Sequence, residues 1–180
     1  MNNLSSLEEI SQFRAKHYSA ELIIDTNILL LLLVGAYDKE FLTNCGLMTE
    51  NGKNYKIEDY NVLIKIVARF LNKITITPQI TAEIWSLSKT KIPSVIFNKY
   101  FSQTLESLKS YQEKNIPLSV ILQNHQQVLE FGFTDIGLTE AARENKAIIL
   151  TDEYPFYATF REKIPIIKFS NIVAQHLINN

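Results

Sequence analysis

The chain has 180 residues, of which 46% are hydrophobic and 21% are charged, and its formal net charge is −1. This composition excludes an intrinsically disordered chain, and the charge excludes a strongly basic protein that grips duplex nucleic acid over many phosphates. The single cysteine excludes an intrachain disulfide and a cysteine-based zinc site. We therefore expect one globular domain over residues 1–180 in a reducing, cytoplasmic compartment.

The apolar segments of the sequence are short. The longest apolar run, Ile28 to Val34, is far too short to span a bilayer. Acidic residues appear as early as Glu8, and the first residues lack the apolar run of a signal peptide. We expect no association with a membrane.

The first part of the chain predicts a helix followed by a buried strand. Residues 4–19 have the spacing of an amphipathic helix, which Ser5 or Ser6 can cap. We expect this helix to be an amino-terminal extension over residues 1–20. The apolar run of residues 21–25 then predicts a short strand.

A very apolar helix and an irregular segment come next. Residues 27–36 predict a helix that ends near Gly35, since glycine is favoured just past a helix end. Turn residues, among them an Asn-Gly pair, predict a loop or small hairpin insertion over residues 43–56. Residues 57–72 return to helical spacing.

The middle of the chain repeats the alternation of strand and helix. Residues 73–77 are rich in β-branched side chains and predict a strand, and Pro78 can open the helix that follows. Further helices are expected over residues 93–113 and 118–131, the second of them ended by Gly132.

The last part of the chain predicts a helix over residues 134–145, a buried strand over 147–150 and a final strand over 165–169 before a short terminal helix. Short apolar strands that alternate with longer helical segments are typical of a parallel sheet covered on both faces. The sequence therefore predicts an α/β protein, built as a three-layer α/β/α sandwich with a central parallel sheet.

Four acidic residues follow strands or open helices in this arrangement. They are Asp25, Glu83, Asp135 and Asp152. In a parallel sheet, ligands bind beyond the carboxyl ends of the strands, so all four acids are expected at one rim. Each acid alone has a simpler interpretation, because Asp before a helix is a common N-cap and Glu within a helix is commonly solvated.

The four acids together predict a metal site. Asp25 ends a fully apolar strand, where an ionised carboxylate is unfavourable unless a partner compensates its charge. Carboxylates that are crowded at one rim also repel one another and raise each other's pKa. A hard divalent cation removes both penalties, and Mg²⁺ or Mn²⁺ prefers oxygen ligands. The absence of a His pair or thiolate set argues against zinc.

Four ordered motifs resemble those of the PIN-domain nucleases. The motifs are Leu22-Ile23-Ile24-Asp25-Thr26-Asn27-Ile28-Leu29, Thr77-Pro78-Gln79-Ile80-Thr81-Ala82-Glu83, Phe133-Thr134-Asp135-Ile136-Gly137-Leu138-Thr139-Glu140-Ala141-Ala142 and Ile148-Ile149-Leu150-Thr151-Asp152-Glu153. Each motif is weak alone, but the ordered set is fairly specific and covers about residues 21–170.

The resemblance implies a metal-dependent endoribonuclease with a PIN-like fold. Asp25, Glu83, Asp135 and Asp152 would be the catalytic ligands of one or two Mg²⁺ or Mn²⁺ ions. The resemblance also implies supporting roles: Asn27 would position Asp25, Thr151 would support Asp152, and Glu153 would be an outer ligand or a favourable charge at a helix start. The expected substrate is single-stranded RNA.

The resemblance also implies partners. Many PIN-domain proteins are toxins of toxin–antitoxin pairs, so an antitoxin protein is an expected partner, and exposed helical faces could form a homodimer. The amino-terminal helix, the 43–56 segment and the longer chain depart from the compact toxin pattern. These departures bear on the toxin role more than on the chemistry.

Substrate contacts are less well specified by the sequence. Basic and aromatic side chains of the central helices could hold a single strand and stack its bases, or they could form an ordinary solvated face. The residues in question are Lys65, Arg69, Lys89, Lys91, Lys99, Tyr100 and Lys109.

Two other functions are compatible with the same residues. The fold could carry a non-catalytic module that binds nucleic acid or protein, since fold alone does not carry function. Asp25 could instead be the nucleophile of an aspartyl phosphotransferase. That chemistry commonly uses a second acid two residues later, where this chain has Asn27.

Overall fold

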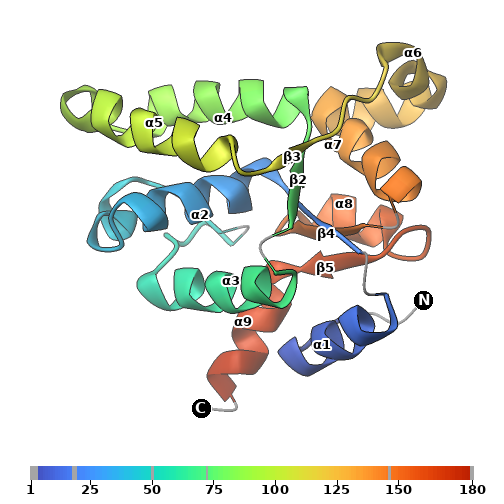
Figure 1. Ribbon diagram of the computed structural model, residues 1–180, viewed down its shortest axis with the longest axis horizontal. Helices are drawn as coiled ribbons and strands as arrows, with labels where there is room; N and C mark the ends of the chain where they lie inside the picture. The colour runs from blue at the N-terminus through green and yellow to red at the C-terminus, as the bar shows by residue number, and fades with distance from the viewer. Residues whose placement is uncertain (1–3, 18–19, 50, 72, 146, 179–180) are drawn as a thin grey trace.

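The computed structural model describes residues 4–17, 20–49, 51–71, 73–145 and 147–178. Its strands are β1 (Leu22–Ile24), β2 (Ile74–Ile76), β3 (Gln112–Glu113), β4 (Ile148–Thr151) and β5 (Ile166–Lys168). They form one parallel sheet in the order β3-β2-β1-β4-β5 (Figure 1). The prediction of an α/β fold with a parallel sheet is confirmed.

Helices cover the sheet and complete a three-layer α/β/α sandwich (Figure 1). The α-helices of the described residues are α1 (Leu7–Lys16), α2 (Thr26–Tyr37), α3 (Ile57–Arg69), α4 (Pro78–Lys91), α5 (Ser94–Leu108), α6 (Leu118–Ile121), α7 (His125–Asn145), α8 (Tyr154–Phe160) and α9 (Phe169–Ile178). None of these helices combines the length and the apolar character needed to cross a membrane.

The central strand β1, and β4 up to its last residue, Thr151, are apolar because helices cover both faces of the sheet. Every residue of Leu22–Ile24 and of Ile148–Leu150 is fully buried. The chain moves from β1 through β2 to β3 and then returns to β4 on the other side of β1. The strand order therefore reverses between β1 and β4, and ligands of such sheets bind beyond the carboxyl ends at this point.

The predicted amino-terminal helix is confirmed as α1. Ser6 caps it, since the Ser6 Oγ accepts from the Glu9 backbone N–H at 3.1 Å, and the Glu9 side chain accepts from the Ser6 backbone N–H at 3.1 Å. The helix packs against α3, and Arg14 lies over the Phe70 ring at 5.3 Å. Its status as an extension of a smaller domain stays a prediction.

The predicted apolar helix is confirmed as α2, which extends one residue beyond each predicted end. Gly35 lies in its last turn, and the helix ends at Tyr37. A Cβ atom at Gly35 would lie 2.2 Å from Cδ2 of Tyr60, so the glycine permits the close approach of α3. Gly35 therefore lies near the helix end, as predicted, and also serves interhelix packing.

Residues 43–56 contain the small hairpin that was one of the two predicted forms. A 3₁₀ turn, η1 (Glu40–Asn44), leads into it. Met48 and Asn54 then form an antiparallel bridge, and the Tyr55 N–H donates to the Leu47 carbonyl at 3.0 Å. The turn brings the Tyr55 side chain back into the interior, where it is 2% exposed.

The structure corrects the two long helices predicted for the second half of the chain. The helix expected over 93–113 ends at Leu108, and the exposed edge strand β3 follows it. The segment 118–131 is divided into α6, the 3₁₀ turn η2 (Leu122–Asn124) and the first part of α7. Gly132 breaks α7 with φ of 84°, as its predicted role as a helix end implies.

Two elements were missed by the sequence reasoning. The two residues of β3 are polar and exposed, so they lack the apolar pattern that marks a strand. Helix α8 is a short helix after β4 with Pro155 in its first turn, and it buries Phe156, Tyr157 and Phe160. Both lie in segments for which the apolar periodicity was too short to detect.

Candidate functional site

Asp25 stands at the carboxyl end of β1 and is only 5% exposed. It is the N-cap residue of α2, but its side chain makes no capping hydrogen bond. Instead, its Oδ2 accepts a hydrogen bond from the Thr151 hydroxyl, which lies 2.7 Å away at the end of β4. The neighbouring strands β1 and β4 therefore fix the position of this carboxylate together.

Burial raises the pKa of Asp25 to about 7, and the negative charges of Glu153 and Glu83 act in the same direction. Hydrogen bonding from the Thr151 side chain and from the Thr26 backbone opposes this rise without cancelling it, because such bonds stabilise the ionised form. The charge on Asp25 is thus poorly compensated by this chain alone. A cation at this position would remove the penalty.

Glu83 lies on α4, which begins where β2 ends. Thr77 caps this helix, because its hydroxyl accepts from the Ile80 N–H at 3.4 Å, and Pro78 occupies the first turn. The half-buried Glu83 carboxylate accepts a hydrogen bond from the Thr26 hydroxyl at 2.9 Å. Since Thr26 follows Asp25 directly, this bond joins Glu83 to the end of β1.

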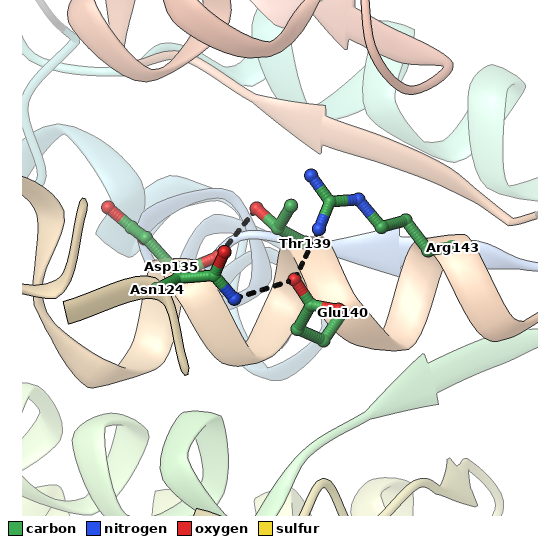
Figure 2. Close-up of polar contacts among 5 residues, drawn as sticks. All are labelled: Asn124, Asp135, Thr139, Glu140 and Arg143. Carbon is green, nitrogen blue, oxygen red and sulfur yellow. Dashed lines mark hydrogen bonds and ion pairs between the residues drawn. The ribbon is translucent and has the colours of Figure 1, made fainter. Parts of the chain in front are cut away.

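Asp135 lies in the first turn after the break of α7 at Gly132. Burial, together with the nearby charges of Asp25, Glu153 and Glu83, raises the pKa of Asp135 to about 8. Its backbone carbonyl accepts a hydrogen bond from the Thr139 hydroxyl at 2.9 Å. In Figure 2 the Asp135 carboxyl points away from the more distal polar side chains of the same helix.

Glu140, one turn and a half further along α7, has a different environment. Its Oε1 accepts from the Asn124 amide at 3.2 Å and forms an ion pair with Arg143 (Figure 2). Its charge is therefore compensated within the helix and by the preceding turn. The contrast with Asp135 shows that uncompensated charge is a property of the rim and not of α7 as a whole.

Asp152 follows β4 and is 4% exposed. Its Oδ2 accepts from the Tyr55 hydroxyl at 3.0 Å, and its Oδ1 accepts from the Ser170 backbone N–H at 3.0 Å. Burial raises the pKa of Tyr55, and the charge of Asp152 raises it further. The phenol therefore stays protonated and is the donor of the hydrogen bond to Asp152. Both oxygens of Asp152 thus have donors from this chain.

The structure assigns the predicted supporting residues somewhat different positions. Thr151 donates to Asp25 and not to Asp152, and it accepts from the Glu153 N–H at 3.0 Å. Asn27 is exposed and makes no hydrogen bond to Asp25, whose only hydroxyl donor is Thr151. Glu153 is exposed at the start of α8 and acts on Asp25 through its charge.

Three of the predicted acids interact through their charges. The negative charges of Asp25 and Glu83 both raise the pKa of Asp135. Asp152 belongs to the same rim, because it lines a cavity of about 180 Å³ together with Asp25. The other lining residues are Asn27, Met48, Thr49, Tyr55 and Glu153.

The side chains at this rim suit a metal ion in the type of their donor atoms more than in their spacing. Among the described residues, no three His, Cys, Asp or Glu side chains are grouped closely enough to hold a metal ion. The donors are nevertheless all oxygens, which suits Mg²⁺ or Mn²⁺. In addition, no described lysine or arginine forms an ion pair with Asp25, Glu83 or Asp135.

Comparison with known proteins adds nothing to these observations. No protein-family model, curated protein or solved structure gives a significant match to this chain. The resemblance to PIN-domain nucleases therefore stays a prediction, and it rests on the four ordered motifs.

Three residues that shape the rim were not among the predicted site residues. Thr26 holds Glu83, and its place directly after Asp25 could have indicated this role. Tyr55 lies in a turn segment without periodicity, and Ser170 contributes only its backbone N–H. Neither has a feature in the sequence that connects it with Asp152, which is 97 residues from Tyr55.

The predicted substrate-binding side chains do not form one exposed surface. Tyr100 is fully buried and shares a hydrogen bond with Ser88 at 3.3 Å, so it cannot stack on a base. Arg69 donates to the Leu7 carbonyl at 3.0 Å and holds α1 against α3. Lys89 lies over the rings of Trp85 and Phe97 at 5.0 and 4.3 Å.

Proposed function

We propose that this protein is a divalent-metal-dependent endonuclease that hydrolyses phosphodiester bonds, with single-stranded RNA as its substrate. The observation that carries the proposal is Asp25. It is a buried carboxylate at the point where the strand order reverses, it lies among other acids, and no described basic residue pairs with it. Such a group is unfavourable without a cation, and phosphodiester hydrolysis is a common use of a bound cation at carboxylates.

In this proposal Asp25, Glu83 and Asp135 would hold the ion, and Asp152, which lines the same cavity as Asp25, would be a further ligand. A bound Mg²⁺ or Mn²⁺ lowers the pKa of a water and neutralises charge on the phosphate oxygens. The hydroxyls of Thr151 and Thr26 orient Asp25 and Glu83.

The substrate class is inferred from the shape and charge of the rim and from the resemblance. A net charge of −1 and half-buried acids do not suit a duplex gripped along its backbone. A flexible single strand can present one phosphate to the cavity beside Asp25. The choice of RNA rests on the resemblance to PIN-domain nucleases, as do an antitoxin partner and a toxin role.

The proposal is tested by incubating the purified protein with labelled single-stranded RNA and DNA, in Mn²⁺ or in EDTA. We expect cleavage of RNA in Mn²⁺, no cleavage in EDTA, and none by Asp25→Asn. Asp38→Asn is the matched control, because Asp38 is an exposed residue at the end of α2. Cleavage that persists in EDTA or in Asp25→Asn would contradict the proposal.

A second function is favoured by two other observations. The described carboxylates are not grouped closely enough to hold an ion, and both oxygens of Asp152 already accept hydrogen bonds. These features favour a non-catalytic module that binds nucleic acid or protein through the same fold. Binding of RNA without cleavage, equally strong in Mn²⁺ and in EDTA, would support the module.

A further inference from the structure

The hairpin of residues 47–55 lies against the acidic rim, although it is far from Asp152 in sequence. Met48, Thr49 and Tyr55 line the same cavity as Asp25 and Asp152. Met48 is 57% exposed, whereas Tyr55 at the other end of the hairpin is 2% exposed. The hairpin therefore forms one wall of the cavity, and its Tyr55 side chain is buried in the interior.

Two donors hold the two oxygens of Asp152. The Tyr55 hydroxyl donates to Oδ2 at 3.0 Å, and the Ser170 N–H donates to Oδ1 at 3.0 Å. The Tyr55 ring also packs against Phe169, the residue before Ser170, with ring centres 6.2 Å apart. The two donors thus belong to one packed unit, made by the hairpin and the first turn of α9.

A carboxylate that is held at both oxygens cannot rotate freely about its Cβ–Cγ bond. A carboxylate oxygen can accept more than one hydrogen bond, so a single donor on each oxygen orients the group without excluding a metal ion. Groups that orient ligating carboxylates in this way commonly change metal affinity by about 10- to 100-fold when they are removed. The Tyr55 hydroxyl has the contacts that this role requires.

We propose that Tyr55 is a positioning residue, whose hydroxyl fixes the Asp152 carboxylate at the wall of the cavity shared with Asp25. The effect of Tyr55 on metal binding rests on the proposed function. The hydrogen bond itself and its energetic coupling to Asp152 do not. A test with two parts can therefore separate failure of this proposal from failure of the metal site.

The first part is a double-mutant cycle of unfolding in EDTA, with Tyr55→Phe, Asp152→Asn and the double variant. Tyr55→Phe keeps the ring that packs on Phe169 and removes only the hydroxyl. We expect the two substitutions to be coupled by about fivefold or more in the unfolding equilibrium constant. Additive effects would overturn the proposal, and so would a Tyr55→Phe chain that does not fold, because a positioning hydroxyl is not required for folding.

The second part measures Mn²⁺ affinity in the wild type, Tyr55→Phe and Tyr100→Phe. Tyr100 is the matched control, since it is an equally buried tyrosine whose hydroxyl bonds to Ser88 and not to an acid. We expect about tenfold weaker Mn²⁺ binding for Tyr55→Phe and no change for Tyr100→Phe. Equal binding by Tyr55→Phe and wild type would overturn the proposal. If the wild type binds no Mn²⁺, the proposed function fails, and the cycle in EDTA alone decides the role of Tyr55.

Discussion

Two buried aspartates at neighbouring strand ends of this protein have opposite electrostatic situations. Asp25 at the end of β1 receives one hydroxyl hydrogen bond, and its pKa is raised to about 7 by burial and by nearby acids. Asp152 after β4 receives a phenol on one oxygen and a backbone N–H on the other. The comparison teaches that burial alone does not show how well the chain compensates the charge of a carboxylate. Asp25 is the more informative of the two, because its buried charge is the more poorly compensated.

The largest expected effects come from replacing each of these two aspartates by asparagine. Asp25→Asn and Asp152→Asn are both expected to reduce RNA cleavage by more than about 100-fold, since even groups that only orient a ligand give losses of about 10- to 100-fold. Their effects on the metal-free fold should have opposite signs. Asp25→Asn removes a repelling charge, so the free energy of unfolding should stay equal or rise.

Asp152→Asn should instead lower that free energy by about 1 kcal/mol, because the Asn NH₂ group faces a donor from Tyr55 or Ser170. Urea unfolding in EDTA measures both variants. A marked destabilisation by Asp25→Asn would show that Asp25 is a structural residue. The contrast between Asp25 and Asp152 would then not hold.

A smaller effect is expected within α7, where Asp135 and Glu140 offer the same contrast on one helix (Figure 2). Asp135→Asn should reduce cleavage by about 100-fold without loss of stability, because burial and acidic neighbours raise the pKa of Asp135 to about 8. Glu140→Gln should leave cleavage unchanged and reduce stability by less than about 1 kcal/mol, since its partner Arg143 is partly exposed. Cleavage rates and urea midpoints of the two variants check this, and equal losses of activity would place Glu140 in the site.

The smallest effect tests the hydroxyl that orients Asp25. Thr151→Val should reduce cleavage by about tenfold, because the 2.7 Å hydrogen bond to Asp25 is lost. The matched control is Thr75→Val, since Thr75 is also a buried strand residue whose hydroxyl donates to a carboxylate, that of Glu21 at 2.6 Å. Both variants should lose similar stability in urea, and only Thr151→Val should lose activity. The same loss of activity in both would indicate a general effect of strand packing.

Much of the fold could be predicted from the sequence because its strands are apolar and its helices are amphipathic. β1 and the first three residues of β4 are continuous apolar runs, and Ser6, Pro78 and Gly132 mark helix ends by local chemistry. β3 could not be predicted, because two exposed polar residues join the sheet only through tertiary pairing. The packing role of Gly35 could not be predicted for a similar reason, since the Tyr60 ring that lies against it belongs to another helix.

The candidate site was predictable in its acids and not in their partners. Strand ends and helix starts predicted Asp25, Glu83, Asp135 and Asp152 at one rim. In the structure Asp25 and Asp152 line one cavity, and the Thr26 hydroxyl joins Glu83 to the end of β1. The hydrogen bonds depend on contacts between distant segments, such as Thr151 with Asp25 and Tyr55 with Asp152. Sequence spacing carries no information about such pairs, so the roles assigned to Thr151 and Asn27 differed from the contacts in the structure.

The central claim is that poorly compensated carboxylates at the rim bind a divalent cation. Titration calorimetry of Mn²⁺ into metal-free wild type, Asp25→Asn and Asp38→Asn tests it directly. The account predicts binding by the wild type and by Asp38→Asn, and loss of binding by Asp25→Asn. An absence of Mn²⁺ binding by the wild type, or equal binding by Asp25→Asn, would contradict it.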